Sequence, residues 1–181
     1  SIRDAIGVYY AKIDEQNPTD NFQWEFVLVD DDQTKNAWCM PGGKIAVYSG
    51  ILQIAKNNDG LASIMGHEIA HAVARHSAER ASRAILMDAS TYAFERLVLG
   101  TSMTGYSREL YGHMRQLGLE LPFSRNQESE ADYLGLVFMN LAGYNSEESY
   151  LVWERMREAI EGKGQAEFFS THPSPKNRII K

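Results

Sequence analysis

The stretch His67-Glu68-Ile69-Ala70-His71 decides how the rest of the chain is interpreted. It lies within residues 61–76, an apolar and alanine-rich run that predicts a helix. Residues four apart on a helix lie one turn apart on the same face, so His67 and His71 present two imidazoles to one point. Two such imidazoles are what a zinc ion needs from its first two ligands. Glu68 lies about 100° around the helix, where it can accept a proton from an attacking water.

Composition limits the class of protein. The chain has 181 residues, of which 44% are hydrophobic, which predicts one domain over residues 1–181 with a real core. The net charge of −6 without a basic block argues against a nucleic-acid partner. Cys39 is the single cysteine, which excludes an intramolecular disulfide and a zinc site built from several thiolates. No apolar run approaches the roughly 18 residues of a membrane span, so no transmembrane segment is expected.

The order of the patterns predicts an α+β fold of the zincin type, mostly helical, with a small sheet near the N-terminus. Three strands are expected, at 22–29, 36–40 and 44–48. Pro41-Gly42-Gly43 predicts a hairpin between the last two, and we expect the whole sheet to be antiparallel. Helices are expected at 2–16, 51–56, 106–117, 127–141 and 147–161, with Gly143 as a C-terminal cap. The helix that carries the two histidines is expected to continue toward Leu86.

The third zinc ligand must come from elsewhere in the chain. Glu128 begins an expected helix, and Asp132 lies one turn further on the same face. A ligand followed by a second carboxylate suits a zinc site, because a ligating histidine needs an acceptor for its other ring nitrogen. An acidic, solvated first turn explains the same residues equally well, since carboxylates are favourable at helix N-termini. His76 would point to the face opposite His67 on a continuous helix, which predicts a surface or second-layer residue and no ligand.

The two motifs resemble the HtpX-like zinc metallopeptidases, the gluzincin family that includes the CAAX prenyl proteases and BepA. The resemblance covers nearly the whole chain in the right order, and it is carried by residues 36–43, 65–71, 124–132, 171–173 and Arg178. It implies that His67, His71 and Glu128 hold one Zn²⁺ per chain and that Glu68 is the catalytic base. Asp132 would hold His67 or His71. The resemblance is greatest to BepA-like members without membrane helices, which implies a bacterial periplasmic or outer-membrane-associated location.

Two C-terminal residues complete the expected site. A histidine before a proline, such as His172, is most often a surface residue, but in this family the matching histidine lies over the zinc. It either supports the transition state or closes the site as a fourth ligand, and both roles are chemically sound. Arg178 is expected to be a second cation near the same place, and a surface ion pair is its alternative.

The substrate and the reaction follow from the resemblance. We expect a zinc endopeptidase that hydrolyses unfolded or misassembled cell-envelope polypeptides, is inhibited by its own His172, and has the envelope assembly machinery as a partner. The alternative is a zinc-binding chaperone or assembly factor with little proteolysis. The strand of Asn36, Ala37, Trp38, Cys39 and Met40 offers backbone groups that can pair with an extended peptide, or it is only part of the sheet. Cys39 is expected to be a buried apolar side chain and not a zinc ligand.

Overall fold

A three-stranded sheet forms one layer of the structure. The computed structural model describes residues 1–97, 105, 109, 112, 121–161 and 172. Strand β1 (Glu25–Val29) pairs in parallel with β3 (Lys44–Tyr48), and β2 (Ala37–Met40) pairs antiparallel with β3, so that the order is β1-β3-β2. The predicted hairpin between β2 and β3 is present. Gly42 and Gly43 make its turn with φ of +88° and +86°, which favours glycine at both positions.

The α+β class is confirmed, but the sheet is mixed and not antiparallel throughout. The segment that leaves β1 crosses the end of β3 before it enters β2. Its Asp31 carbonyl accepts a 3.1 Å hydrogen bond from the Gly50 amide. A Cβ on Gly50 would lie 2.5 Å from the Thr34 carbonyl oxygen, so only glycine permits this crossing. The crossing places β1 and β2 on opposite sides of β3, and β1 therefore runs parallel to its neighbour.

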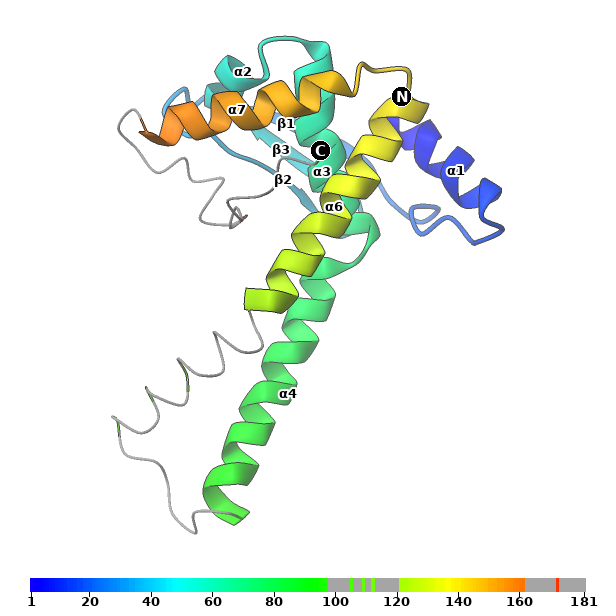
Figure 1. The fold of residues 1–181 in the computed structure, drawn as a ribbon. Coiled ribbons are helices and arrows are strands. Elements are labelled where there is room, and N and C mark those ends of the chain that lie inside the picture. The colour runs from blue at the N-terminus through cyan, green and yellow to red at the C-terminus, as the bar shows by residue number, and fades with distance from the viewer. Residues whose placement is uncertain (98–104, 106–108, 110–111, 113–120, 162–171, 173–181) are drawn as a thin grey trace.

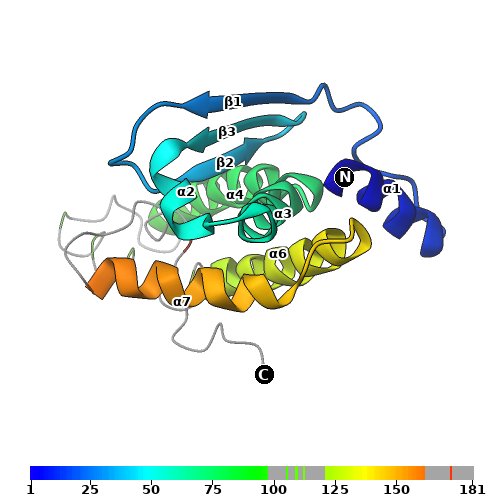
Figure 2. The same cartoon turned by 90° about the horizontal axis from the view of Figure 1, so that it is seen from above.

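The helices form the other layers. They are α1 (Ile2–Lys12), α2 (Ser49–Ala55), α3 (Asn58–Val73), α4 (His76–Leu97), α6 (Leu121–Leu141) and α7 (Glu147–Glu161). Figure 2 shows the sheet on one side, α3 in the middle, and α6 with α7 on the other side. Because α3 is covered from both sides, most of its residues are buried. The helix expected at 106–117 lies mostly outside the described residues.

Two apolar clusters hold these layers together. The larger one joins α1, the sheet, α3 and α6 through Ile6, Ile45, Ile69 and Phe138. The smaller one joins α2, α3 and α7 through side chains that include Ile51, Ile64 and Met156. Both clusters contact α3, so the helix that carries the histidine pair is fixed by packing on several sides.

The expected continuation of α3 toward Leu86 is wrong. The helix ends at Val73, and Arg75 adopts φ of +58°, a left-handed conformation that is uncommon outside glycine. The chain turns there and α4 begins at His76. Figure 1 shows α4 running away from the sheet as a long limb beside the first turns of α6.

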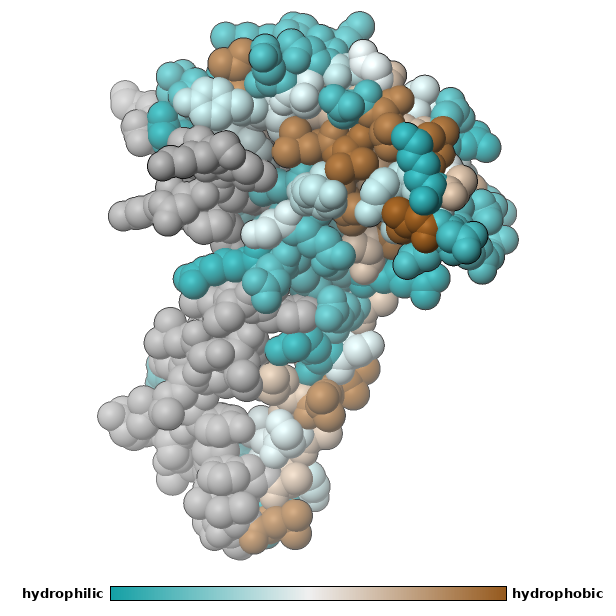
Figure 3. Space-filling model, turned by 45° about the vertical axis from the view of Figure 1, so that its right-hand side comes forward, coloured by the Kyte–Doolittle hydropathy of each residue, from teal (hydrophilic) through white to brown (hydrophobic). Residues whose placement is uncertain are grey.

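Apolar side chains reach the surface along α4. Ile85, Leu86 and Leu97 are 73%, 67% and 84% exposed, and Figure 3 shows brown surface along the limb of the molecule that α4 forms. Within the described part of the chain, no helix combines the length and the hydropathy that crossing a bilayer requires.

Candidate metal centre

Helix α3 brings His67 and His71 together as expected. The helix is capped by Asn57, whose side-chain oxygen accepts a 2.7 Å hydrogen bond from the Gly60 amide. The two imidazoles lie on one face, and their Nε2 atoms are 3.1 Å apart. Trp153 of α7 packs edge-on against His67, with the ring centroids 5.9 Å apart. Packing therefore restricts the pair before any ion binds.

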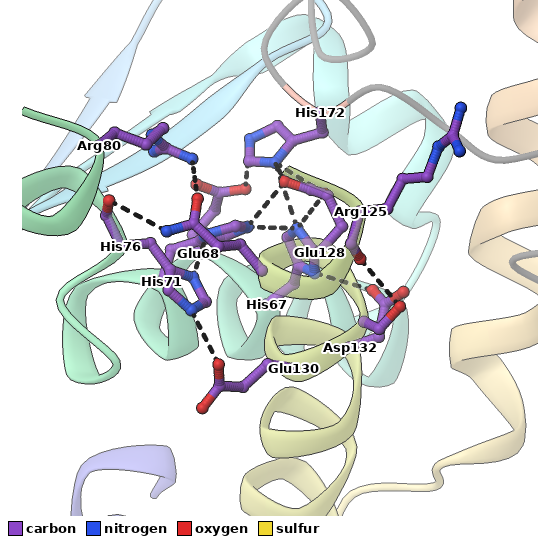
Figure 4. Close-up of polar contacts among 12 residues, drawn as sticks. His67, Glu68, His71, His76, Arg80, Arg125, Glu128, Glu130, Asp132 and His172 are labelled. Carbon is purple, nitrogen blue, oxygen red and sulfur yellow. Dashed lines mark hydrogen bonds and ion pairs between the residues drawn. The ribbon is translucent and has the colours of Figure 1, made fainter. Parts of the chain in front are cut away.

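Glu128, on α6, is the third side chain that could bind the metal, after the two histidines of α3. Its side chain is fully buried. One carboxylate oxygen lies 3.5 Å from Nε2 of His67, and the other lies 3.3 Å from Nε2 of His71. Figure 4 shows the carboxylate pointing at the two rings. Of the two interpretations that the sequence allowed, the buried carboxylate fits the structure and the solvated first turn does not.

His172 enters the same cluster from the C-terminal segment. The residue is buried, which excludes the surface interpretation. Its Nδ1 lies 3.3 Å from each oxygen of Glu128 and 3.3 Å from Nε2 of His67. Its Nε2 lies 3.2 Å from the carboxylate of Glu68. His172 therefore bridges the donor cluster and the carboxylate that the sequence assigns as base. Arg178 lies outside the described residues.

Charge in this cluster is set by burial and by short contacts. Burial disfavours a charge on His67, but hydrogen bonds to Asp132 and Glu128 outweigh it and raise the pKa of His67 to about 9. Burial lowers the pKa of His71 to about 3. Burial disfavours the charge of Glu128 as well, yet hydrogen bonds from the histidines hold its pKa far below the usual range. At neutral pH these pKa values leave Glu128 ionised, His67 protonated and His71 neutral.

The outer ring nitrogens of both histidines have partners. Nδ1 of His67 lies 2.9 Å from a carboxylate oxygen of Asp132. The structure therefore selects His67 from the two histidines that Asp132 was expected to hold. Nδ1 of His71 lies 2.8 Å from Nδ1 of His76. Of the two positions expected for His76, the surface one is wrong and the second-layer one fits. His76 does not point away from the site, because α3 ends before it and the chain turns it back against His71.

The substrate strand expected at 36–40 lies at a sheet edge, as β2. Ala37 and Cys39 point inward and are buried, whereas Trp38 and Met40 are exposed. Burial and the charge of Glu68 raise the pKa of Cys39 to about 12, so the thiol keeps its proton. Cys39 lies outside the cluster of donors that could hold a metal, in agreement with its expected apolar role.

The donor set suits zinc. The four side chains His67, His71, Glu128 and His172 each offer one donor atom, and all of these atoms lie within 4.8 Å of one another. Imidazole nitrogen and carboxylate oxygen are donors that zinc accepts, and zinc sites hold three or four such protein ligands. Asp132 and His76 supply the outer contacts that ligating histidines require. The residues present therefore fit the ion that the sequence implies.

Comparison with known proteins places this site in a family. A model described as peptidase family M48 matches residues 8–181. The chain belongs to peptidase family M48. Members of this family are zinc metallopeptidases, and the expected resemblance, enzyme class and zinc requirement are confirmed at that level. The family also implies polypeptide substrates.

Several curated relatives are similar to this M48 chain. It is 44% identical to the mitochondrial metalloendopeptidase OMA1 of Schizosaccharomyces pombe over 89% of this chain, and 40% identical to the protein of the same name from Saccharomyces cerevisiae over 88%. A putative beta-barrel assembly-enhancing protease of Vibrio cholerae is 28% identical over 82% of this chain and 32% of its own length. The chain spans 46% of each of the two fungal proteins.

The expected bacterial periplasmic or outer-membrane location is wrong. The relatives at 44% and 40% identity are named as mitochondrial, whereas the bacterial relative is much less similar. The motifs that carried the resemblance lie around the metal site, and such motifs report chemistry that several branches of a family share. They contain no information about the compartment.

Proposed function

We propose that residues 1–181 form a single catalytic domain of a zinc-dependent endopeptidase that hydrolyses unfolded or misassembled polypeptides in mitochondria. The observation that carries this proposal is the convergence of His67, His71 and Glu128 beside the carboxylate of Glu68. The names of the fungal relatives support the compartment and the endopeptidase activity.

In this proposal His67, His71 and Glu128 hold the ion and Asp132 orients His67. When bound, zinc would act as a Lewis acid that makes water more acidic and polarises the scissile carbonyl. Glu68 takes the proton of the attacking water and delivers it to the leaving amine. The burial of Glu68 and its position next to the donor cluster support this assignment. Arg178 keeps its expected role as a cation near the oxyanion.

The substrate binds in this proposal as an added strand on β2. In the described residues β2 pairs with β3 on one side only, so its other edge can accept an extended peptide. The strand packs against α3, and Cys39 lies close enough to Glu68 for the carboxylate charge to raise the pKa of the thiol. A peptide on this edge would run past the catalytic carboxylate, with Trp38 and Met40 exposed beside it.

His172 inhibits the enzyme in this proposal by occupying the position that water and the substrate carbonyl need. Its Nδ1 faces Glu128 and His67 at 3.3 Å, which favours a fourth donor. Its Nε2 also engages Glu68 at 3.2 Å, so one side chain blocks both the ion and the base. Displacing His172 would free both.

The same closed arrangement favours a second candidate, a zinc-binding chaperone or assembly factor with little proteolysis. The name of the Vibrio cholerae relative refers to the assembly of beta-barrels. An intact Glu68 at the position of the base favours the peptidase, because a purely structural zinc site has no use for a carboxylate there.

The test is cleavage of casein by the purified chain loaded with zinc. Glu68→Gln keeps the size of the side chain and removes its basicity, so we expect cleavage to fall below detection while zinc stoichiometry stays at about one per chain. A Glu68→Gln variant that still cleaves casein would contradict the assigned mechanism. The chaperone would be favoured by a wild-type chain that binds zinc and suppresses aggregation of an unfolded protein, together with a His172→Ala variant that also lacks proteolytic activity.

A further inference from the structure

His76 is a buried polar side chain that the proposed reaction does not use. It is only 1% exposed, among the most deeply buried side chains of the described residues. Its ring packs against that of His71 with the centroids 4.8 Å apart and the planes at 73°. The two Nδ1 atoms are 2.8 Å apart, a hydrogen-bond distance. Figure 4 shows His76 and Glu130 on the side of His71 that faces away from Glu128.

The direction of this hydrogen bond follows from the chemistry of imidazole. If Nε2 of His71 binds the ion, its Nδ1 carries the hydrogen and donates. Nδ1 of His76 must then accept, which leaves the hydrogen of His76 on Nε2. That Nε2 lies 3.2 Å from a carboxylate oxygen of Glu130, which accepts. The bonds therefore run in one direction, from His71 through His76 to Glu130.

The turn between α3 and α4 makes this contact available. On a continuous helix, a residue five positions after His71 would lie about 140° away from it around the axis. The left-handed conformation of Arg75 breaks the helix and brings His76 back against His71. An uncommon backbone conformation beside a functional site is consistent with a role for the residue that it positions.

Gln127 of α6 also contacts the first residues of α4, next to His76. Gln127, which precedes Glu128, donates from its amide to the carbonyl of His76 at 3.4 Å and to the carboxylate of Glu79 at 2.9 Å. Arg80 donates to the side-chain oxygen of Gln127 at 3.3 Å. The start of α4 is thus tied to the turn of α6 that carries the third donor.

We propose that His76 is a positioning residue that fixes the ring orientation and tautomer of His71 for zinc and passes the hydrogen bond on to Glu130. Each histidine of the pair then has its own carboxylate from α6. His67 contacts Asp132 directly, whereas His71 reaches Glu130 through His76. This inference rests on the proposed role of His71 as a zinc ligand.

The test measures zinc affinity of the metal-depleted full chain by competition with a chromophoric chelator. The unaltered chain is measured first, and failure to bind one zinc would refute the proposed function itself. His76→Leu fills the buried site without polar atoms, and we expect it to weaken zinc binding about 10- to 100-fold. His76→Gln offers one acceptor and one donor, so it should restore most of the affinity. The visible spectrum of the cobalt-substituted chain should shift in His76→Leu and return toward wild type in His76→Gln.

A second variant keeps the test valid if His76→Leu does not fold. Glu130 is 57% exposed on its side chain, so Glu130→Ala should fold and should weaken zinc binding several-fold. Ser129→Ala on the same exposed turn is the matched control and should bind zinc as the wild type does. Zinc affinities of His76→Leu or Glu130→Ala within twofold of wild type, with an unchanged cobalt spectrum, would show that His76 only fills space.

Discussion

Gly66 of α3 and Gly135 of α6 face each other where the two helices cross. A Cβ on Gly135 would lie 2.9 Å from the backbone nitrogen of His67, and a Cβ on Gly66 would lie 3.0 Å from the carbonyl oxygen of Gly135. Backbone atoms cannot move aside as a flexible side chain can. The crossing therefore depends on two glycines, and it sets how closely α6 brings Glu128 to the histidines.

Gly135→Ala should push the two helices apart. Added bulk in a closely packed interface costs typically 1–3 kcal/mol, which exceeds the roughly 1 kcal/mol that alanine gains over glycine inside a helix. We expect a lower urea midpoint of unfolding and weaker zinc binding. Gly7→Ala in α1 is the control, because its Cβ would meet only the Asn17 amide at 3.7 Å. That variant should be as stable as the wild type or slightly more stable, and equal behaviour of the two variants would contradict the close crossing.

Asp132→Ala removes the acceptor at Nδ1 of His67, 2.9 Å away. The loss of such an outer partner typically costs 10- to 100-fold in metal affinity, and we expect a weakening in this range by chelator competition. Asp20→Ala, at an exposed position in the loop after α1, is the control and should leave zinc affinity unchanged. An Asp132→Ala variant with wild-type affinity would mean that the contact does not support the site.

His172→Ala should increase the rate of casein cleavage if the side chain blocks Glu68 and the donor cluster. We expect a gain of several-fold or more at unchanged zinc stoichiometry, because three donors still remain. Activity equal to or below that of the wild type would argue against self-inhibition and for a role of His172 in the transition state. His172→Gln keeps a polar side chain but loses the ring, so comparing its cleavage rate with that of His172→Ala separates the effect of polarity from that of the imidazole.

Cys39 should resist alkylation over a wide pH range. Only the thiolate reacts readily, and burial together with the charge of Glu68 raises the pKa of Cys39 to about 12. The ionised fraction is therefore very small up to pH 9 and grows only as the pH approaches 12. Iodoacetamide labelling followed by mass spectrometry should show little modification of the folded chain between pH 7 and 9. Rapid labelling at pH 8 in the native state would contradict the burial of β2 against α3.

Much of the fold was predictable because local patterns coincide with the elements. The bounds of β3 match the expected 44–48 and those of α7 match 147–161. Gly143 has the positive φ of a helix cap. The described part of helix α6 begins at Leu121, earlier than the expected residue 127. The parallel pairing of β1 was not predictable, since it depends on how the segment that follows β1 passes Gly50.

The donor triad was predictable from spacing and resemblance, but the helix break that brings His76 against His71 was not. No glycine or proline marks the break at residues 74 and 75, and alanine with arginine favours a continuous helix. The left-handed Arg75 directly precedes His76, whose ring packs against His71 and whose carbonyl accepts a hydrogen bond from Gln127. Tertiary contacts thus overrode local preference at the position where the sequence contains no signal.

The separation of the donors along the chain has a consequence for the order of folding. His67 and His71 approach each other as soon as α3 forms, because they are local to one helix. Glu128 joins them only after α6 has docked across a long intervening segment, and contacts between distant residues form late when loop closure must come first. Two imidazoles alone bind zinc weakly, so tight zinc uptake should follow the docking of α6. In this chain the metal would then secure a nearly finished fold and would not act as its nucleus.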